Sequence, residues 1–190
     1  MIDEAKIEKA ITDIIKAIGE DPGREGLKDT PKRVAEMYAE LFVGVYKDPR
    51  EELDVGFELG HREMVVLKDI PFYSMCEHHL LPFYGTVHIG YIPNATGRVV
   101  GGSKLARVVE TVARRPQVQE RMTTEIADAI DDGIKPAGVA VVIQAEHLCM
   151  VMRGIKKPGS NVITSAIRGA FRRRPASRAE FFSLIQGKRD

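Results

Sequence analysis

The spacing of hydrophobic positions separates a helical beginning of the chain from a remainder that contains strands. Isoleucines recur every three or four positions in residues 7–18, which predicts an amphipathic helix. A second helix is expected to begin with a cap and a first-turn proline at Thr30–Pro31 and to end at Gly44. We expect residues 1–45 to form an N-terminal helical arm and residues 46–190 to form the main domain.

After the arm, strand patterns and helical patterns follow each other. The segment "YGTVHIGYI", residues 84–92, alternates apolar and polar side chains as a half-buried strand does. Two further strands, expected within residues 138–152 and 161–171, are joined by the polar loop "RGIKKPGS" and should pair antiparallel. Helices are expected at residues 101–115, 116–133 and 177–185. This order predicts an α+β fold with helices packed on an antiparallel sheet.

The composition is that of an ordinary globular protein. Of 190 residues, 44% are hydrophobic and 29% are charged, which is enough apolar surface for a core. No apolar run approaches the ~20 residues of a membrane helix, and the acidic start "MIDEAKIEKA" differs from a signal peptide. We therefore expect a cytoplasmic protein with no membrane partner, in which Cys76 and Cys149 serve metal binding or catalysis instead of a disulfide.

Charge is balanced overall but uneven along the chain. The net charge of +1 gives no whole-protein argument for a nucleic-acid partner. Between Glu146 and Glu180 there is no carboxylate, so this region should attract anions unless it is simply a solvated basic face. Its basic residues are Arg153, Lys156, Lys157, Arg168, Arg172, Arg173, Arg174 and Arg178.

The segment "SMCEHHLLPFYG", residues 74–85, concentrates candidate metal ligands. Cys76 and His79 are spaced so that both can face one point from a single turn of backbone. His147 and Cys149 lie two apart in an expected strand and should project from the same sheet face. Mixed thiolate and imidazole ligands are what Zn²⁺ prefers. The sequence therefore predicts a zinc site built from these two segments.

The number of candidate donors favours a catalytic metal. With His78, the two segments hold more donors than the three protein ligands that a catalytic zinc normally takes. Surplus histidines beside an ion with an open position suit acid-base chemistry, and a closed structural zinc is the alternative. His61, in a loop, is expected to face solvent, and His88 to be a packed or hydrogen-bonded strand residue.

A second candidate site lies at the start of the expected helix "GGSKLAR". The free N–H groups and the dipole of a helix start attract phosphate, and Ser103 at the cap, Lys104 and Arg107 can gather there. An ordinary capped helix with solvated basic residues is the alternative. In "QVQER", Gln119 precedes Glu120, a carboxylate that could accept paired N–H groups, as on a guanine edge, or could simply be solvated.

Three segments together resemble the GTP cyclohydrolase I family of zinc enzymes. They are "CEHHLLPFYGTVHIGYIP", "GGSKLARVVETVARRPQVQERMTTEIADAI" and "GVAVVIQAEHLCMVMRGIKKPGS", and the likeness covers nearly the whole chain after about Gly23. The resemblance implies the tunnelling fold (T-fold), in which antiparallel sheets of several subunits form a barrel surrounded by helices. It also implies a homo-oligomer, a decamer of two five-membered rings with active sites at subunit interfaces, and makes residues 46–190 the catalytic domain.

The family's site residues can be placed on this sequence. The resemblance implies that Cys76, His79 and Cys149 bind zinc, which leaves His78 and His147 for proton transfer. The implied reaction hydrolyses GTP at C8 of the guanine ring to formate and 7,8-dihydroneopterin triphosphate, the first step of folate and pterin biosynthesis. The other implied site residues are Gln119 and Glu120 at the guanine edge, Ser103 in the rearrangement and near the substrate, and Lys104, Arg107, Arg153 and Arg33 at the triphosphate.

Two departures and two competing interpretations accompany this resemblance. Gly102 stands where a larger apolar residue is expected and Pro116 where a leucine is expected, and both bear on loop geometry more than on chemistry. Other T-fold enzymes, the pyruvoyl-tetrahydropterin synthases and the nitrile reductases of queuosine synthesis, use three histidines or a catalytic cysteine without this ligand set. A zinc-stabilised module that binds RNA through the basic C-terminal third would leave the surplus histidines and "QVQER" unexplained.

Overall fold

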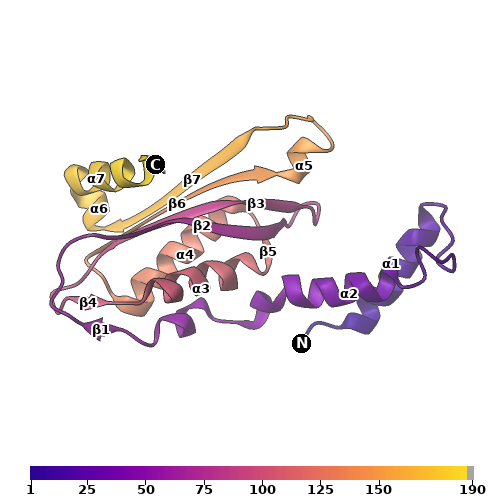
Figure 1. The fold of residues 1–190 in the computed structure, drawn as a ribbon, viewed down its shortest axis with the longest axis horizontal. Helices are drawn as coiled ribbons and strands as arrows, with labels where there is room; N and C mark the ends of the chain where they lie inside the picture. Colours follow the sequence, from indigo (N-terminus) through magenta and orange to yellow (C-terminus); the bar gives the residue numbers. More distant parts are fainter. Residues whose placement is uncertain (188–190) are drawn as a thin grey trace.

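A five-stranded sheet forms the centre of the computed structural model, which describes residues 1–187 (Figure 1). The strand order is β5-β2-β3-β6-β7; the four long strands pair antiparallel, and the short β5 pairs parallel with the end of β2. The strands are β2 (Val65–Cys76), β3 (Pro82–Ile92), β5 (Pro116–Gln117), β6 (Gly138–His147) and β7 (Asn161–Gly169). The predicted α+β class and the antiparallel pairing of the long strands are confirmed. Residues 188–190 of the predicted main domain lie outside the described part.

Helices α3 (Gly102–Ala113) and α4 (Gln119–Ile134) cover one face of the sheet (Figure 1). Their apolar residues recur at helical spacing and pack against alternate side chains of β3, such as the fully buried Val87 and Ile89. A fully buried large apolar side chain contributes about 1.5–3 kcal/mol, so this layer forms the main core.

The opposite face is covered at one end by α7 (Pro175–Gln186; Figure 1). Phe181 is fully buried there, and a Cβ at Gly90 would lie 2.6 Å from its ring, so β3 accepts only glycine at this point. Ala140 and Val142 of β6 belong to the same cluster. Residues 138–143 of β6 are buried on both faces, so they form a continuous apolar run without alternation, whereas Gln144 beyond them is exposed.

The N-terminal helices form a pair that extends away from the sheet (Figure 1). In the first helix only Ile15 is buried, whereas Ile14 and Ile18 are 54% and 71% exposed. None of the helices in residues 1–187 has the length and hydropathy that a membrane span requires. The elements outside the layers already described are α1 (Glu4–Ala17), α2 (Thr30–Leu41), the 3-10 turns η1 (Val43–Tyr46) and η2 (Pro49–Leu53), β1 (Phe57–Glu58), β4 (Arg98–Val99), α5 (Leu148–Val151) and α6 (Ala170–Arg173).

Three predicted helix starts are wrong by one to three residues. Thr30, Ser103 and Ser177 lie inside the first turns of α2, α3 and α7. The cap positions are Asp29, Gly101 and Arg174, and none of these residues caps a backbone N–H of its helix with a side chain. In α2 and α7 a proline in the first turn presets the helical φ angle, so these helices start without a side-chain cap.

Pro116 was expected to open a helix, and that expectation is also wrong. Pro116 and Gln117 pair with Met75 and Cys76 at the end of β2, and α4 begins only at Gln119. Pairing with β2 holds these two residues in a strand, and this tertiary contact overrides the local preference of proline for a helix start.

Two histidines outside the metal motif behave as expected. His88 is buried on β3, and its Nδ1 accepts a hydrogen bond of 3.1 Å from the Asp69 backbone N–H at an irregularity of β2. His61 is exposed in the loop before β2.

Candidate metal centre and active site

Two strand ends bring the candidate metal ligands together. Cys76 is the last residue of β2, and in the tight turn that follows, the N–H groups of His79 and Leu80 donate to the Cys76 carbonyl. Cys149 lies on α5, the helical turn that follows β6. Since β2 and β6 both pair with β3, the two segments lie at the same end of the sheet.

The prediction that His147 and Cys149 project from one strand face is wrong. β6 ends at His147, which pairs with Phe83, and α5 follows directly. β3 itself begins at Pro82, so a longer β6 would soon lack a ladder partner. A helical turn, and not strand alternation, therefore directs the Cys149 thiol toward Cys76.

The three predicted ligands lie together, and their geometry is consistent with zinc. One ligand atom each from Cys76, His79 and Cys149 lie within 4.8 Å of one another, and the two sulfur atoms are 3.9 Å apart. Two sulfurs bound at about 2.3 Å to one tetrahedral Zn²⁺ would be separated by about 3.8 Å. Two thiols and one imidazole thus suit an ion that keeps a fourth position for another ligand.

Both cysteines are free thiols, and Cys76 is buried. Burial raises the pKa of the Cys149 thiol, and its hydrogen bond to Cys76 raises that pKa further. A metal ion must therefore displace protons from this pair, so the affinity for the metal should increase with pH.

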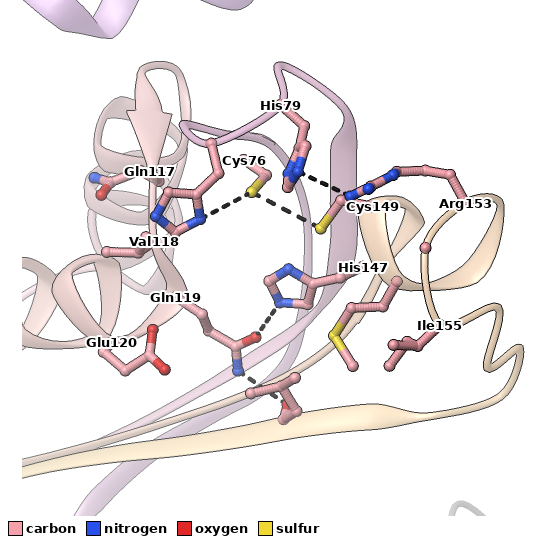
Figure 2. A pocket seen from close by; sticks show the side chains of 14 residues that line it. Cys76, His79, Gln117, Val118, Gln119, Glu120, His147, Cys149, Arg153 and Ile155 are labelled. Atoms are coloured by element: carbon pink, nitrogen blue, oxygen red, sulfur yellow. Dashed lines mark hydrogen bonds between the residues drawn. The ribbon is translucent and has the colours of Figure 1, made fainter.

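A cavity of about 530 Å³ opens beside the ligand cluster (Figure 2). This volume is within the range of ~300–1,000 Å³ that small-molecule sites occupy. His78 and His147 line the cavity together with Glu120 and Arg153. Figure 2 shows the Glu120 carboxylate and the Arg153 guanidinium on opposite sides of His147. An elongated ligand with hydrogen-bond donors at one end and negative charge at the other would match this arrangement.

His147 is fixed by two contacts. Its ring stacks on Phe83, with centroids 4.5 Å apart and planes 5° from parallel, and its Nε2 lies 2.8 Å from Gln119 Oε1. Burial lowers the pKa of the imidazole, and the charge of Glu120 partly opposes this effect. The other ring nitrogen faces the pair of thiols (Figure 2).

Two further side chains contact the ligand cluster without belonging to it. His78 Nδ1 lies 3.8 Å from the sulfur of Cys76. Arg153 Nη1 donates to His79 Nε2 over 2.9 Å. The structure thus places His78 and Arg153 beside the ligand cluster, and the predicted contact of Arg153 with the triphosphate stays a prediction.

The turn after Cys76 is anchored on α4 by residues that the sequence reasoning missed. Arg121 donates to the Glu77 carboxylate and to Gln117 Oε1, and the Glu77 N–H donates to the Gln117 carbonyl. The hydrogen bond from Arg121 lowers the pKa of Glu77. No local pattern could have revealed this link, because it exists only once β5 pairs with β2.

The two predicted guanine contacts have different environments. Glu120 is exposed and lines the cavity, so its carboxylate can accept hydrogen bonds from a ligand. Gln119 is only 1% exposed, and its amide already bonds to protein groups. The predicted contact of Gln119 with guanine stays a prediction.

Four predicted substrate contacts lie outside this cavity. Among residues 1–187, the cavity wall includes none of Ser103, Lys104, Arg107 and Arg33. The C-terminal end of α3 leads through β5 to the cavity, and a helix of 12 residues is about 18 Å long, so the first turn of α3 lies far from it. Arg33 belongs to α2 of the N-terminal pair. One chain therefore does not bring these four residues to the metal centre.

The α+β fold, the three-ligand cluster and the unliganded imidazoles in one cavity define a metalloenzyme. The family model for GTP cyclohydrolase I matches residues 7–186. This chain belongs to the GTP cyclohydrolase I family.

Curated relatives match along the full length. GTP cyclohydrolase 1 of Dehalococcoides mccartyi is 72% identical over 188 residues, which are 99% of this chain and 100% of the relative. GTP cyclohydrolase 1 of Carboxydothermus hydrogenoformans is 63% identical over 185 residues, 97% of this chain and 96% of the relative. Among solved structures, the apo form of the archaeosine synthase QueF-Like is 18% identical with a TM-score of 0.43, and covers 56% of this chain and 93% of its own.

Proposed function

We propose that this protein hydrolyses GTP at C8 of the guanine ring, releases formate and forms 7,8-dihydroneopterin triphosphate. The observation that carries the proposal is the placement of Cys76, His79 and Cys149 around one point, with His78 and His147 in the same cavity. The full-length relatives named GTP cyclohydrolase 1 support it. The need for free thiols at Cys76 and Cys149 supports a cytoplasmic location.

Zinc is the proposed cofactor, held by Cys76, His79 and Cys149. When bound, it supplies a Lewis acid and lowers the pKa of a coordinated water toward ~7. The chain holds the sulfur atoms of Cys76 and Cys149 3.9 Å apart and places His78 next to them. His78 can then accept and return protons near the reacting water and the ribose.

His147 is the proposed proton donor to N7 of guanine. Protonation of N7 makes C8 electrophilic, so that water adds there and the imidazole ring opens to a formamide. A second hydrolysis then releases formate. Stacking on Phe83 and the contact with Gln119 hold the imidazole in place, which reduces the entropy cost of proton transfer.

Recognition of guanine is assigned to Glu120. The N1–H and the 2-amino group of guanine present two neighbouring donors, and a carboxylate can accept from both. Glu120 and Arg153 lie on opposite sides of His147 (Figure 2), so guanine bound at Glu120 can direct its triphosphate toward Arg153.

Ser103, Lys104, Arg107 and Arg33 are proposed to complete the site from neighbouring subunits. Their distance from the cavity within one chain supports this arrangement. Within residues 1–187, no strand pairs with the outer edge of β7, and β2 is paired on its outer side only by the two-residue β5. Unpaired edges of this length favour sheet continuation between subunits. We therefore propose the T-fold barrel and the decamer of two five-membered rings.

Incubation with GTP tests the proposed function. The purified zinc-loaded protein should release formate and form a pterin chromophore in equal amounts. ATP is the matched control, because its ring lacks the donor pair that Glu120 accepts, and it should not react. Binding of GTP without formate release would contradict the proposal.

A further inference from the structure

The buried amide of Gln119 joins three elements next to His147. Gln119 begins α4, and its Nε2 lies 3.1 Å from the Ile143 carbonyl of β6 and 2.9 Å from the Val162 carbonyl of β7. It also lies 3.1 Å from Oγ1 of Thr164. Since carbonyl oxygens only accept hydrogen bonds, the atom that faces them must be the amide nitrogen.

This orientation of the amide decides which nitrogen of His147 carries hydrogen. Gln119 Oε1 is the atom that lies 2.8 Å from His147 Nε2. Oε1 has no hydrogen to donate, so Nε2 must carry one. A neutral imidazole has a single N–H, which leaves Nδ1 with a lone pair. Figure 2 shows this second nitrogen facing Cys76 and Cys149.

Two threonine hydroxyls close the network. Oγ1 of Thr123 lies 2.6 Å from the Gln119 backbone carbonyl and 2.6 Å from Oγ1 of Thr164. Thr123 must donate its one hydrogen to the carbonyl, so Thr164 must donate to Thr123 and accept from Gln119. Each hydroxyl hydrogen thus has one acceptor, and the two hydrogens of the Gln119 amide nitrogen are shared among the Ile143 and Val162 carbonyls and Oγ1 of Thr164. A flipped Gln119 amide would set its oxygen against two carbonyl oxygens, at the cost of unpaired buried groups.

We propose that Gln119, oriented by Thr164 and Thr123, is a positioning residue that keeps His147 in its Nε2-protonated tautomer. The atom that exchanges a proton with the substrate is then Nδ1. In that step the Nδ1–H bond of the imidazolium breaks as the N–H bond at guanine N7 forms, and a neutral ring with hydrogen on Nε2 remains. This inference rests on the proposed function, and it adds the reacting atom and the residues that select it.

Kinetics of three variants test the inference. Gln119→Met keeps the side-chain volume but removes both hydrogen-bonding ends, and kcat should fall about 10- to 100-fold, as for lost outer-shell partners. Thr164→Val should lower kcat by a smaller factor, and Thr164→Ser, which keeps the hydroxyl, should restore it. Zinc content should stay near wild type, because neither side chain belongs to the ligand cluster. Thr124→Val, a neighbouring exposed threonine, is the matched control.

A spectroscopic measurement separates tautomer control from a merely structural role. Solid-state NMR of the sedimented, zinc-loaded protein with ¹⁵N-labelled histidine reports the protonation of each ring nitrogen. The His147 signals, identified by their loss in His147→Ala, should show a protonated Nε2 in the wild type and in Thr164→Ser, and a mixture in Gln119→Met. If Gln119→Met does not fold, the His147 signals of Thr164→Val and Thr164→Ser are compared instead.

Two results would overturn the inference. One is a wild-type His147 with hydrogen on Nδ1 alone, and the other is a folded Gln119→Met protein with unchanged kcat and unchanged signals. A wild-type protein that shows the Nε2-protonated ring but does not turn over GTP would contradict the proposed function and not the tautomer assignment.

Discussion

The sulfur atoms of Cys76 and Cys149 lie 3.9 Å apart, although 73 positions separate the two residues along the chain. Cys76 ends β2, and Cys149 lies one residue into the helical turn after β6. Both strands are hydrogen-bonded to β3, so the register of the sheet sets the distance between the sulfurs. Ligands held in this way lose little conformational freedom when they bind an ion.

Removal of zinc should abolish GTP turnover and lower the melting temperature while the secondary structure persists. The main core between the sheet and α3 and α4 does not depend on the ion, whereas a ligand at a thousand times its Kd adds about 4 kcal/mol to the free energy of unfolding. Before and after chelation, metal analysis measures the zinc content, circular dichroism the secondary structure, and calorimetry the melting temperature. Zinc added back should restore both properties, and full turnover by metal-free protein would contradict the assignment.

Replacement of His147 by alanine should abolish turnover while zinc stays bound. A general acid contributes about 10²- to 10⁴-fold to the rate, and His147 is not in the ligand cluster. His61→Ala, which removes an exposed histidine far from the motif, is the control and should keep wild-type kcat. A His147→Ala protein that loses its metal and unfolds would instead favour a structural zinc.

Loss of the ion pair between Glu77 and Arg121 should weaken zinc binding. The pair anchors the turn that carries His78 and His79 to α4, and outer-shell partners of this kind are worth about 10- to 100-fold in metal affinity. Competition with a chromogenic chelator measures the zinc affinity of Glu77→Gln and Arg121→Met.

The free energy of unfolding should change little in these two variants, because both side chains are more than a third exposed to solvent. The matched control is Arg24→Met, which removes the exposed pair of Arg24 with Glu20 in the N-terminal region. Equal zinc affinities in all of these variants would show that the turn does not need its anchor.

The stability of the protein should decrease below about pH 6.5 through His88. Burial lowers the pKa of His88; the nearby Asp69 carboxylate opposes that effect and Lys68 adds to it. The unfolded chain takes up a proton near the ordinary value of 6.5, whereas the folded protein does so only at lower pH. The contribution of neutral His88 is therefore complete above that value and is lost as the pH falls toward the folded pKa.

His88→Asn should remove this part of the pH dependence, because the Asn oxygen can still accept from the Asp69 N–H but does not titrate. α7 contributes only uncharged side chains to the cavity that His88 lines, namely Phe182, Ile185 and Gln186. Urea unfolding at pH values on both sides of about 6.5 gives the free energy of unfolding. His61→Asn is the control, and a wild-type and a His88→Asn protein with parallel pH profiles would contradict the prediction.

The sequence by itself determined the order of the longer helices and strands and the chemistry of the donors. Apolar residues occupy the buried side of each element. Their spacing therefore shows that side, with period 2 around Val87 and Ile89 and with helical period after Gly102. The preference for zinc follows from the thiols of Cys76 and Cys149, since ligand chemistry belongs to the side chain itself.

Only the tertiary structure decided how those donors are presented. Pro116 lies in a strand because β2 pairs with it, and Cys149 lies on a helical turn because β3 begins only beside His147 and offers no partner beyond it. The amide of Gln119 is committed to the carbonyls of β6 and β7 and to Thr164, 45 positions away. These contacts depend on the register between strands and on the placement of α4 against them. Local periodicity shows which face of an element is buried but not which distant residue it meets, so the structure alone revealed these partners.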